Sequence, residues 1–136
     1  MTYWVISANP RVFNHERAFK DLGFIDWRQT RNFSIGDIVY VYVTYPIPSV
    51  NYKTEIVDVG MSFTNISNFS QYWKGDKGAG ESNYKYARLR LLMTFNDERL
   101  KLKELRNHGM KYAPQSPMKA NDVLIQYLTD IEGDLV

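Results

Sequence analysis

The segment at residues 38–45 constrains the fold of this chain more than any other. It reads IVYVYVTY and follows an SIGD turn at residues 34–37. In a β-strand its valines would point to one side and Ile38, Tyr40 and Tyr42 to the other, so both faces carry side chains that favour burial. Gly36 permits the positive φ of a tight turn, and Asp37 can accept hydrogen bonds from the turn backbone. We therefore expect an inner strand of a barrel or sandwich.

The rest of the chain alternates short strands with short helices. Apolar alternation predicts strands at residues 3–7, 52–59 and 84–93, with 61–66 extending or bending the second of these after a bulge at Gly60. One helix is expected between an N-cap at Asn14 and a terminating Gly23, another within residues 97–108 before Gly109, and a last one from Ser116-Pro117 onward. A length of 136 residues suits one domain, 1–136. This order predicts an α+β fold.

Composition excludes several classes of site. Cysteine is absent, which rules out disulfides, a thiol nucleophile and cysteine-based metal sites. His15 and His108 are the only histidines and fall on different expected helices, where a terminal histidine is usually solvated or caps the helix. We expect no metal, no cofactor and no catalytic residue. With no leader and no apolar run of about 20 residues, we expect a cytoplasmic protein with no membrane association.

The three tryptophans differ in their surroundings. Trp4 lies in an apolar strand and is expected in the core. Trp27 and Trp73 lie in polar segments, where they either pack against the barrel rim or face a ligand. Stacking of a flat base on an aromatic ring is a common use of such residues.

Basic residues gather in the later half of the chain although the net charge is only +2. Such a local patch either contacts phosphates or forms a solvated face. Lys74, Lys77, Lys85, Arg88 and Arg90 outnumber Asp76 and Glu81 there.

Taken together, the chain resembles an EVE domain of the PUA-like superfamily, which also contains the ASCH and YTH domains. The resemblance rests on the order of YWVISANP, GDIVYVYV, YKTEIV, YARLRLL and LKLKELRNHGM, and it runs over residues 1–131. It implies a small, strongly bent mixed β-barrel flanked by short helices. The glycine-rich segment after Trp73 and a lysine, Lys101, where a helix N-cap is expected depart from the family pattern.

The resemblance also implies a function, the reading of a modified base in DNA or RNA without catalysis. IDWRQT is similar to the YTH segment that supplies the first cage tryptophan, and YWKGD, more loosely, to the one that supplies the second. Trp27 and Trp73 would then stack on a methylated base, and Ser7 and Asn9 would contact its edge. Lys74, Lys77, Arg88 and Arg90 would hold the nucleic-acid backbone.

Two other functions remain open from the sequence. An ASCH-type hydrolase acting on a modified nucleoside would use Lys53-Thr54-Glu55, and it requires Lys53 to point into the same pocket as Trp27 within reach of a carboxylate. The ordinary alternative for Lys53 and Glu55 is an ion pair on a solvent face. A protein-interaction domain would instead show an exposed apolar patch.

Overall fold

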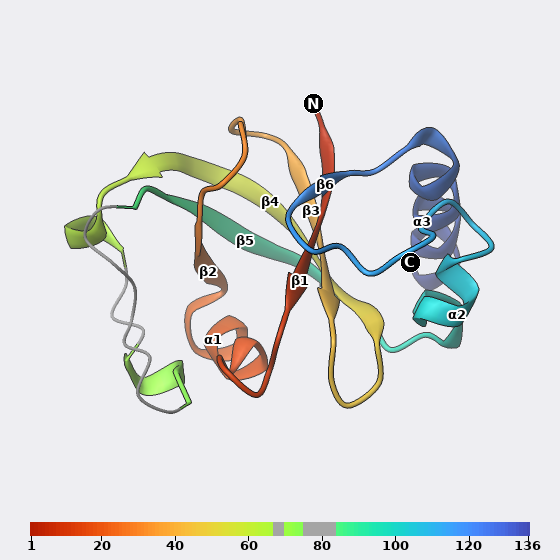
Figure 1. Ribbon diagram of the computed structural model, residues 1–136, viewed down its shortest axis with the longest axis horizontal. Coiled ribbons are helices and arrows are strands. Elements are labelled where there is room, and N and C mark those ends of the chain that lie inside the picture. Colours follow the sequence, from red (N-terminus) through yellow and green to blue (C-terminus); the bar gives the residue numbers. More distant parts are fainter. Residues whose placement is uncertain (67–69, 75–83) are drawn as a thin grey trace.

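The computed structural model describes residues 1–66, 70–74 and 84–136. Its described part is a six-stranded mixed sheet, in the order β2-β5-β4-β3-β1-β6, with helices on both sides (Figure 1). The strands are β1 (Tyr3–Ala8), β2 (Phe24–Arg28), β3 (Ile38–Val43), β4 (Ser49–Met61), β5 (Tyr86–Thr94) and β6 (Met118–Lys119). The helices are α1 (His15–Leu22), α2 (Leu102–Leu105) and α3 (Asp122–Leu135), with 3-10 turns η1 (Phe63–Asn65), η2 (Ser70–Tyr72) and η3 (Glu98–Leu100).

Strand β3 lies inside the sheet, as the sequence predicts. It pairs in parallel with β1 and antiparallel with β4, and all six of its residues are buried. The turn before it is fixed by Asp37, whose carboxylate accepts hydrogen bonds from the Thr2 and Ser34 backbone N–H groups and from the Trp4 indole N–H. Burial raises the pKa of Asp37, but these hydrogen bonds outweigh it and leave the pKa below its ordinary value.

Side-chain alternation along β1 and β3 divides the core into two clusters. Trp4, Ile6 and Ala8 pack on one face with Ala18 and Phe19 of α1. On the other face, Val5, Tyr40 and Tyr42 pack with residues of α2 and α3, including Leu105, Leu124 and Leu128. Figure 1 shows α1 and the α2–α3 pair on opposite sides of β1 and β3. Any side chain of β1 or β3 therefore belongs to either the α1 side or the α3 side.

Three expectations about architecture need correction. The sheet is not closed into a barrel, because β2 and β6 form its two ends. Trp27 lies in strand β2, paired with β5, and not in a loop. The last helix begins at Asp122 and not at Ser116-Pro117, because residues 118–119 pair with β1 and Asn121 caps the helix by accepting a hydrogen bond from Leu124 N–H.

Other local predictions are confirmed. Asn14 accepts a hydrogen bond from Arg17 N–H at the start of α1, and Gly23 ends that helix with a left-handed φ of 77°. Gly60 has a φ of 62° where the β4–β5 register shifts. Lys101 precedes α2 without a side-chain cap, and α2 is a single turn. None of the described helices is both long enough and apolar enough to cross a membrane.

Candidate functional site

Five aromatic side chains from separate parts of the chain gather on the α1 side of the sheet. This aromatic cluster consists of Phe13, His15, Trp27, Tyr72 and Trp73. The Phe13 ring lies edge-on to Trp73 (5.1 Å between centroids), to His15 (4.8 Å) and to Tyr72 (6.1 Å). The His15 ring is 6.0 Å from that of Trp27. Phe13 and His15 thus connect Trp27 to Trp73, two residues far apart in the sequence.

Backbone hydrogen bonds hold this cluster together. Asn14 N–H donates to the Tyr72 carbonyl (2.7 Å) and Lys74 N–H to the Val12 carbonyl (2.8 Å), on either side of a bridge between Phe13 and Trp73. Trp27 is placed independently, by the pairing of β2 with β5. The cluster is therefore built on a strand and on two segments that are tied to each other.

Two buried nitrogen atoms in the cluster have no hydrogen-bond partner. They are Nδ1 of His15 and Nε1 of Trp73, and no other side-chain nitrogen or oxygen in the described part of the chain is both buried and unpaired in this way. Leaving such a group unpaired costs about 1–3 kcal/mol, so native structures contain few of them. Both belong to rings that pack against Phe13, so this cluster is a place where a ligand or water can complete the hydrogen bonding.

His15 is neutral at physiological pH. Only 3% of the residue is exposed, and this burial lowers its pKa to about 4, with a smaller contribution from the positive charge of Lys74. A neutral imidazole carries one donor and one acceptor nitrogen. The expectation that His15 would be a solvated or capping residue is wrong, because Phe13 and Trp27 pack against it.

The lowered pKa predicts an acid-dependent stability. The unfolded chain binds a proton at His15 near pH 6.5 and the folded chain only near pH 4, so His15 lowers stability as pH falls through that window. We expect its contribution to reach about 1.4 kcal/mol per pH unit there. Urea unfolding at a series of pH values would measure this, and His15→Phe should remove that part of the slope. An unchanged slope in the variant would contradict the assignment.

The structure does not bring Ser7 to the aromatic cluster. Ser7 follows Ile6 and precedes Ala8, which both face α1, so its own side chain lies on the α3 side, where its hydroxyl donates to the Pro114 carbonyl (2.6 Å). Asn9 is exposed, and its Oδ1 accepts a hydrogen bond from Arg11 N–H (3.0 Å). Both side chains therefore have structural partners already.

The residues predicted to contact the nucleic-acid backbone fall into three groups. Lys74 is exposed beside Trp73 and forms no ion pair with a described residue. Arg88 and Arg90 are engaged with carboxylates: Arg88 forms two hydrogen bonds with Asp26 (2.8 and 3.0 Å), and Arg90 one with Glu55 (2.6 Å). Lys77 lies outside the described residues.

Lys53 does not meet the requirement of the hydrolase alternative. Its ammonium group contacts Glu132 of α3 at 2.5 Å, and the same carboxylate accepts a hydrogen bond from the Tyr40 hydroxyl (2.7 Å). Tyr40 and α3 belong to the core on the opposite face of the sheet from Trp27. Lys53 thus has a carboxylate partner, but on the face of the sheet opposite Trp27.

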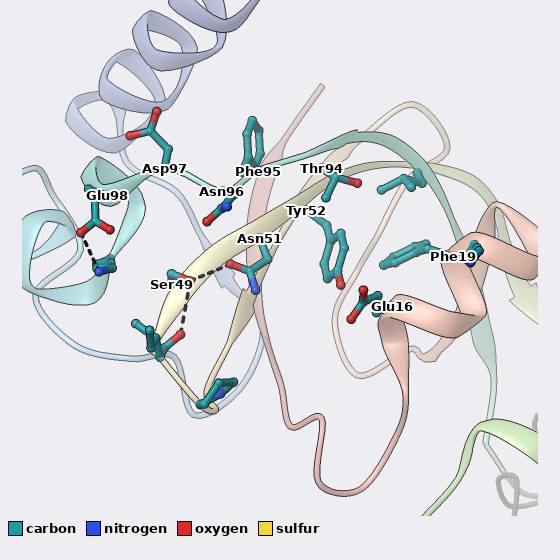
Figure 2. A pocket seen from close by; sticks show the side chains of 15 residues that line it. Glu16, Phe19, Ser49, Asn51, Tyr52, Thr94, Phe95, Asn96, Asp97 and Glu98 are labelled. Carbon is teal, nitrogen blue, oxygen red and sulfur yellow. Dashed lines mark hydrogen bonds and ion pairs between the residues drawn. The ribbon is translucent and has the colours of Figure 1, made fainter.

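A separate cleft of about 510 Å³ opens between α1 and the adjoining ends of β4 and β5. Glu16 and Phe19 of α1 face Tyr52 across it (Figure 2). Burial raises the pKa of Tyr52 to about 12, and the charge of Glu16 adds to this effect. The cleft includes none of the sequence-predicted site residues. Within the described ranges, no group of three or more histidine or acidic side chains could hold a metal ion.

Comparison with known proteins shows the fold. No family model matches the sequence, and neither does any curated protein. Solved structures match along nearly the whole chain. A hypothetical protein from Leishmania major is 20% identical with a TM-score of 0.65, over 99% of this chain and 96% of that one. An ASCH protein from Zymomonas mobilis is 15% identical with a TM-score of 0.62, over 96% of this chain and 95% of that one. The DUF55 domain of human thymocyte nuclear protein 1 is 12% identical with a TM-score of 0.65, over 97% of this chain and 99% of that one.

The chain has the fold of the ASCH and DUF55 domains. The predicted α+β class is confirmed, with an open sheet in place of the barrel. Within this ASCH- and DUF55-like fold, the sequence reasoning missed Phe13, His15 and Tyr72 as members of the aromatic cluster. The sequence signal that could have indicated the cluster is the order Phe13-Asn14-His15, in which an aromatic ring stands on each side of the helix cap Asn14.

Proposed function

We propose that the chain is an EVE-like module that binds DNA or RNA and accommodates a modified, methylated base against the aromatic cluster, without catalysis. The observation that carries the proposal is that His15 and Phe13 link Trp27 to Trp73 in one aromatic cluster, which contains two unpaired buried nitrogens. The similarity to ASCH and DUF55 domains supports it at the level of the fold.

The physical basis is stacking. An aromatic ring contributes about 1–3 kcal/mol per stacked base, and it tolerates any base because each has a π-face. A methyl group on the base adds apolar area that aromatic walls remove from water. The base must be unpaired or rotated out of a duplex to reach a tryptophan in this way.

Phosphate contacts would come from the cations beside the two tryptophans. Lys74 follows Trp73 directly, and Arg28 follows Trp27, with its guanidinium 4.3 Å from the centre of the Tyr84 ring. Lys77 remains part of the proposal, whereas Arg88 and Arg90 would first have to leave Asp26 and Glu55. With so few free cations we expect modest affinity that falls as salt rises.

The substitution Trp27→Ala tests this function. We expect it to weaken binding of a short single-stranded oligonucleotide carrying the preferred modified base by at least about tenfold, because the stacking surface is lost. Fluorescence anisotropy on DNA and RNA oligonucleotides with different base modifications would measure it. Tyr112→Ala is the control, since Tyr112 is 78% exposed and is no member of the cluster. The proposal fails if wild type shows no preference among modifications and Trp27→Ala binds equally well.

A further inference from the structure

We infer that His15 Nδ1 and Trp73 Nε1 are the polar groups that hydrogen-bond the edge of the bound base, in place of Ser7 and Asn9. This assignment rests on the proposed function of the aromatic cluster. It names two specificity-determining residues, and it limits the ligand to a heteroaromatic ring with hydrogen-bonding atoms on its edge.

These two nitrogens have unused hydrogen-bonding capacity. Both are buried and unpaired, and each belongs to a ring that packs edge-on against Phe13, with centroid distances of 4.8 Å for His15 and 5.1 Å for Trp73. By contrast, the Ser7 hydroxyl donates to Pro114 and the Asn9 amide oxygen accepts from Arg11. A base edge that hydrogen-bonds His15 and Trp73 would remove two desolvation costs at once, whereas one that bonds Ser7 or Asn9 would compete with existing bonds.

The hydrogen-bonding chemistry of the two groups matches the edge of a nucleobase. An indole N–H is a donor only, so Trp73 needs an acceptor on the ligand, such as a ring nitrogen or a carbonyl oxygen. His15 is buried among aromatic rings and is uncharged at neutral pH, so its Nδ1 either accepts from an amino group or donates to a carbonyl. Every nucleobase edge offers such groups, whereas a purely hydrocarbon ring offers none.

Both residues are anchored through the backbone. His15 is the first residue of α1, immediately after its cap Asn14, and Trp73 is bridged to Phe13 through the backbone. Both nitrogens are therefore held at fixed positions before a ligand arrives. Preorganised groups of this kind distinguish ligands strongly, because a ligand without the matching edge leaves them buried and unpaired.

Two conservative substitutions test the assignment. His15→Phe and Trp73→Phe each keep an aromatic ring in the cluster and remove one nitrogen. The probes are two single-stranded oligonucleotides, one with the base that wild type prefers and one with a shape analogue whose ring edge has no hydrogen-bonding group. We expect wild type to favour the natural edge by about tenfold or more, and each variant to lose most of that preference while still binding the analogue as wild type does. His108→Phe is the matched control, because His108 stacks on Tyr127, 3.8 Å between ring centres, outside the aromatic cluster.

Nitrogen-15 NMR of wild-type protein gives a second measurement that needs no variant to fold. Addition of the preferred oligonucleotide should shift the resonances of His15 Nδ1 and of the Trp73 indole N–H, while those of His108 stay in place. If both variants discriminate like wild type and neither resonance moves, the assignment is overturned, while a loss of binding in Trp27→Ala would leave the proposed function standing. If wild type binds no oligonucleotide, the proposed function and this assignment both fail.

Discussion

Replacing Glu132 by alanine is expected to lower the free energy of unfolding by about 3–5 kcal/mol. The Glu132 side chain is only 9% exposed, with one oxygen 2.5 Å from the Lys53 ammonium and the other accepting from the Tyr40 hydroxyl at 2.7 Å. Removing the carboxylate leaves a largely buried lysine without its counter-charge and a buried phenol without its acceptor. These contacts join α3 to the centre of the sheet, so the loss should appear in urea unfolding as a lower midpoint.

Two further variants distinguish the effect of breaking this buried ion pair from the effect of removing any charge from α3. Asp130→Ala removes an exposed carboxylate from the same helix and should change stability by less than about 0.5 kcal/mol. The double variant Lys53→Met with Glu132→Leu replaces both charges by apolar groups and should recover much of the loss. A Glu132→Ala effect below about 1 kcal/mol would instead place this pair among surface ion pairs, which contribute little.

The ion-pair partners of Lys53 and Glu55 are not predictable from the sequence. Lys53 and Glu55 are two residues apart, and from the sequence an ion pair between them on a solvent face was the ordinary expectation. In the structure Lys53 pairs with Glu132 and Glu55 with Arg90. Neither partner can be found from local spacing, because sheet register and the docking of α3 bring them together.

Sequence patterns predict the structure correctly where the conformation depends only on neighbouring residues. The alternation in β3, the Asn14 cap and the glycine at residue 23 each specify conformation within a few residues, and each was predicted correctly. The start of α3 was misplaced because Ser116-Pro117 also carries a start signal. There the pairing of residues 118–119 with β1 outweighed the local pattern.

The candidate site was predictable only in part for the same reason. Trp27 and Trp73 were singled out from their polar surroundings and the family resemblance, and the structure brings them into one cluster, although their role in binding stays a prediction. The family resemblance implies a site role for Ser7, but strand alternation turns its side chain to the other face. The burial of His15 was not predictable, because it depends on contact with Trp27, which no local pattern connects to it.

Replacing Gly109 by alanine is expected to lower the free energy of unfolding by about 3 kcal/mol. Gly109 has a φ of 99°, a region that costs an alanine about 1–2 kcal/mol. An added Cβ would also lie 2.7 Å from Asn121 Oδ1 and 2.9 Å from Leu124 N. That oxygen caps α3, and the Asn121 amide donates to the Gly109 carbonyl (2.8 Å), so the substitution would disturb a helix cap contributing about 1 kcal/mol as well.

Gly36→Ala is the matched control for this effect. Gly36 has nearly the same φ, 94°, but an added Cβ there meets nothing within 4 Å. The Gly36→Ala substitution should therefore lower the free energy of unfolding only by the cost of a positive φ for alanine, about 1–2 kcal/mol. The difference between the two variants in urea unfolding then measures the steric contact with the α3 cap. Equal losses would mean that Asn121 and Leu124 move aside without cost, and that the close packing of Gly109 against the start of α3 does not contribute to holding that helix on the sheet.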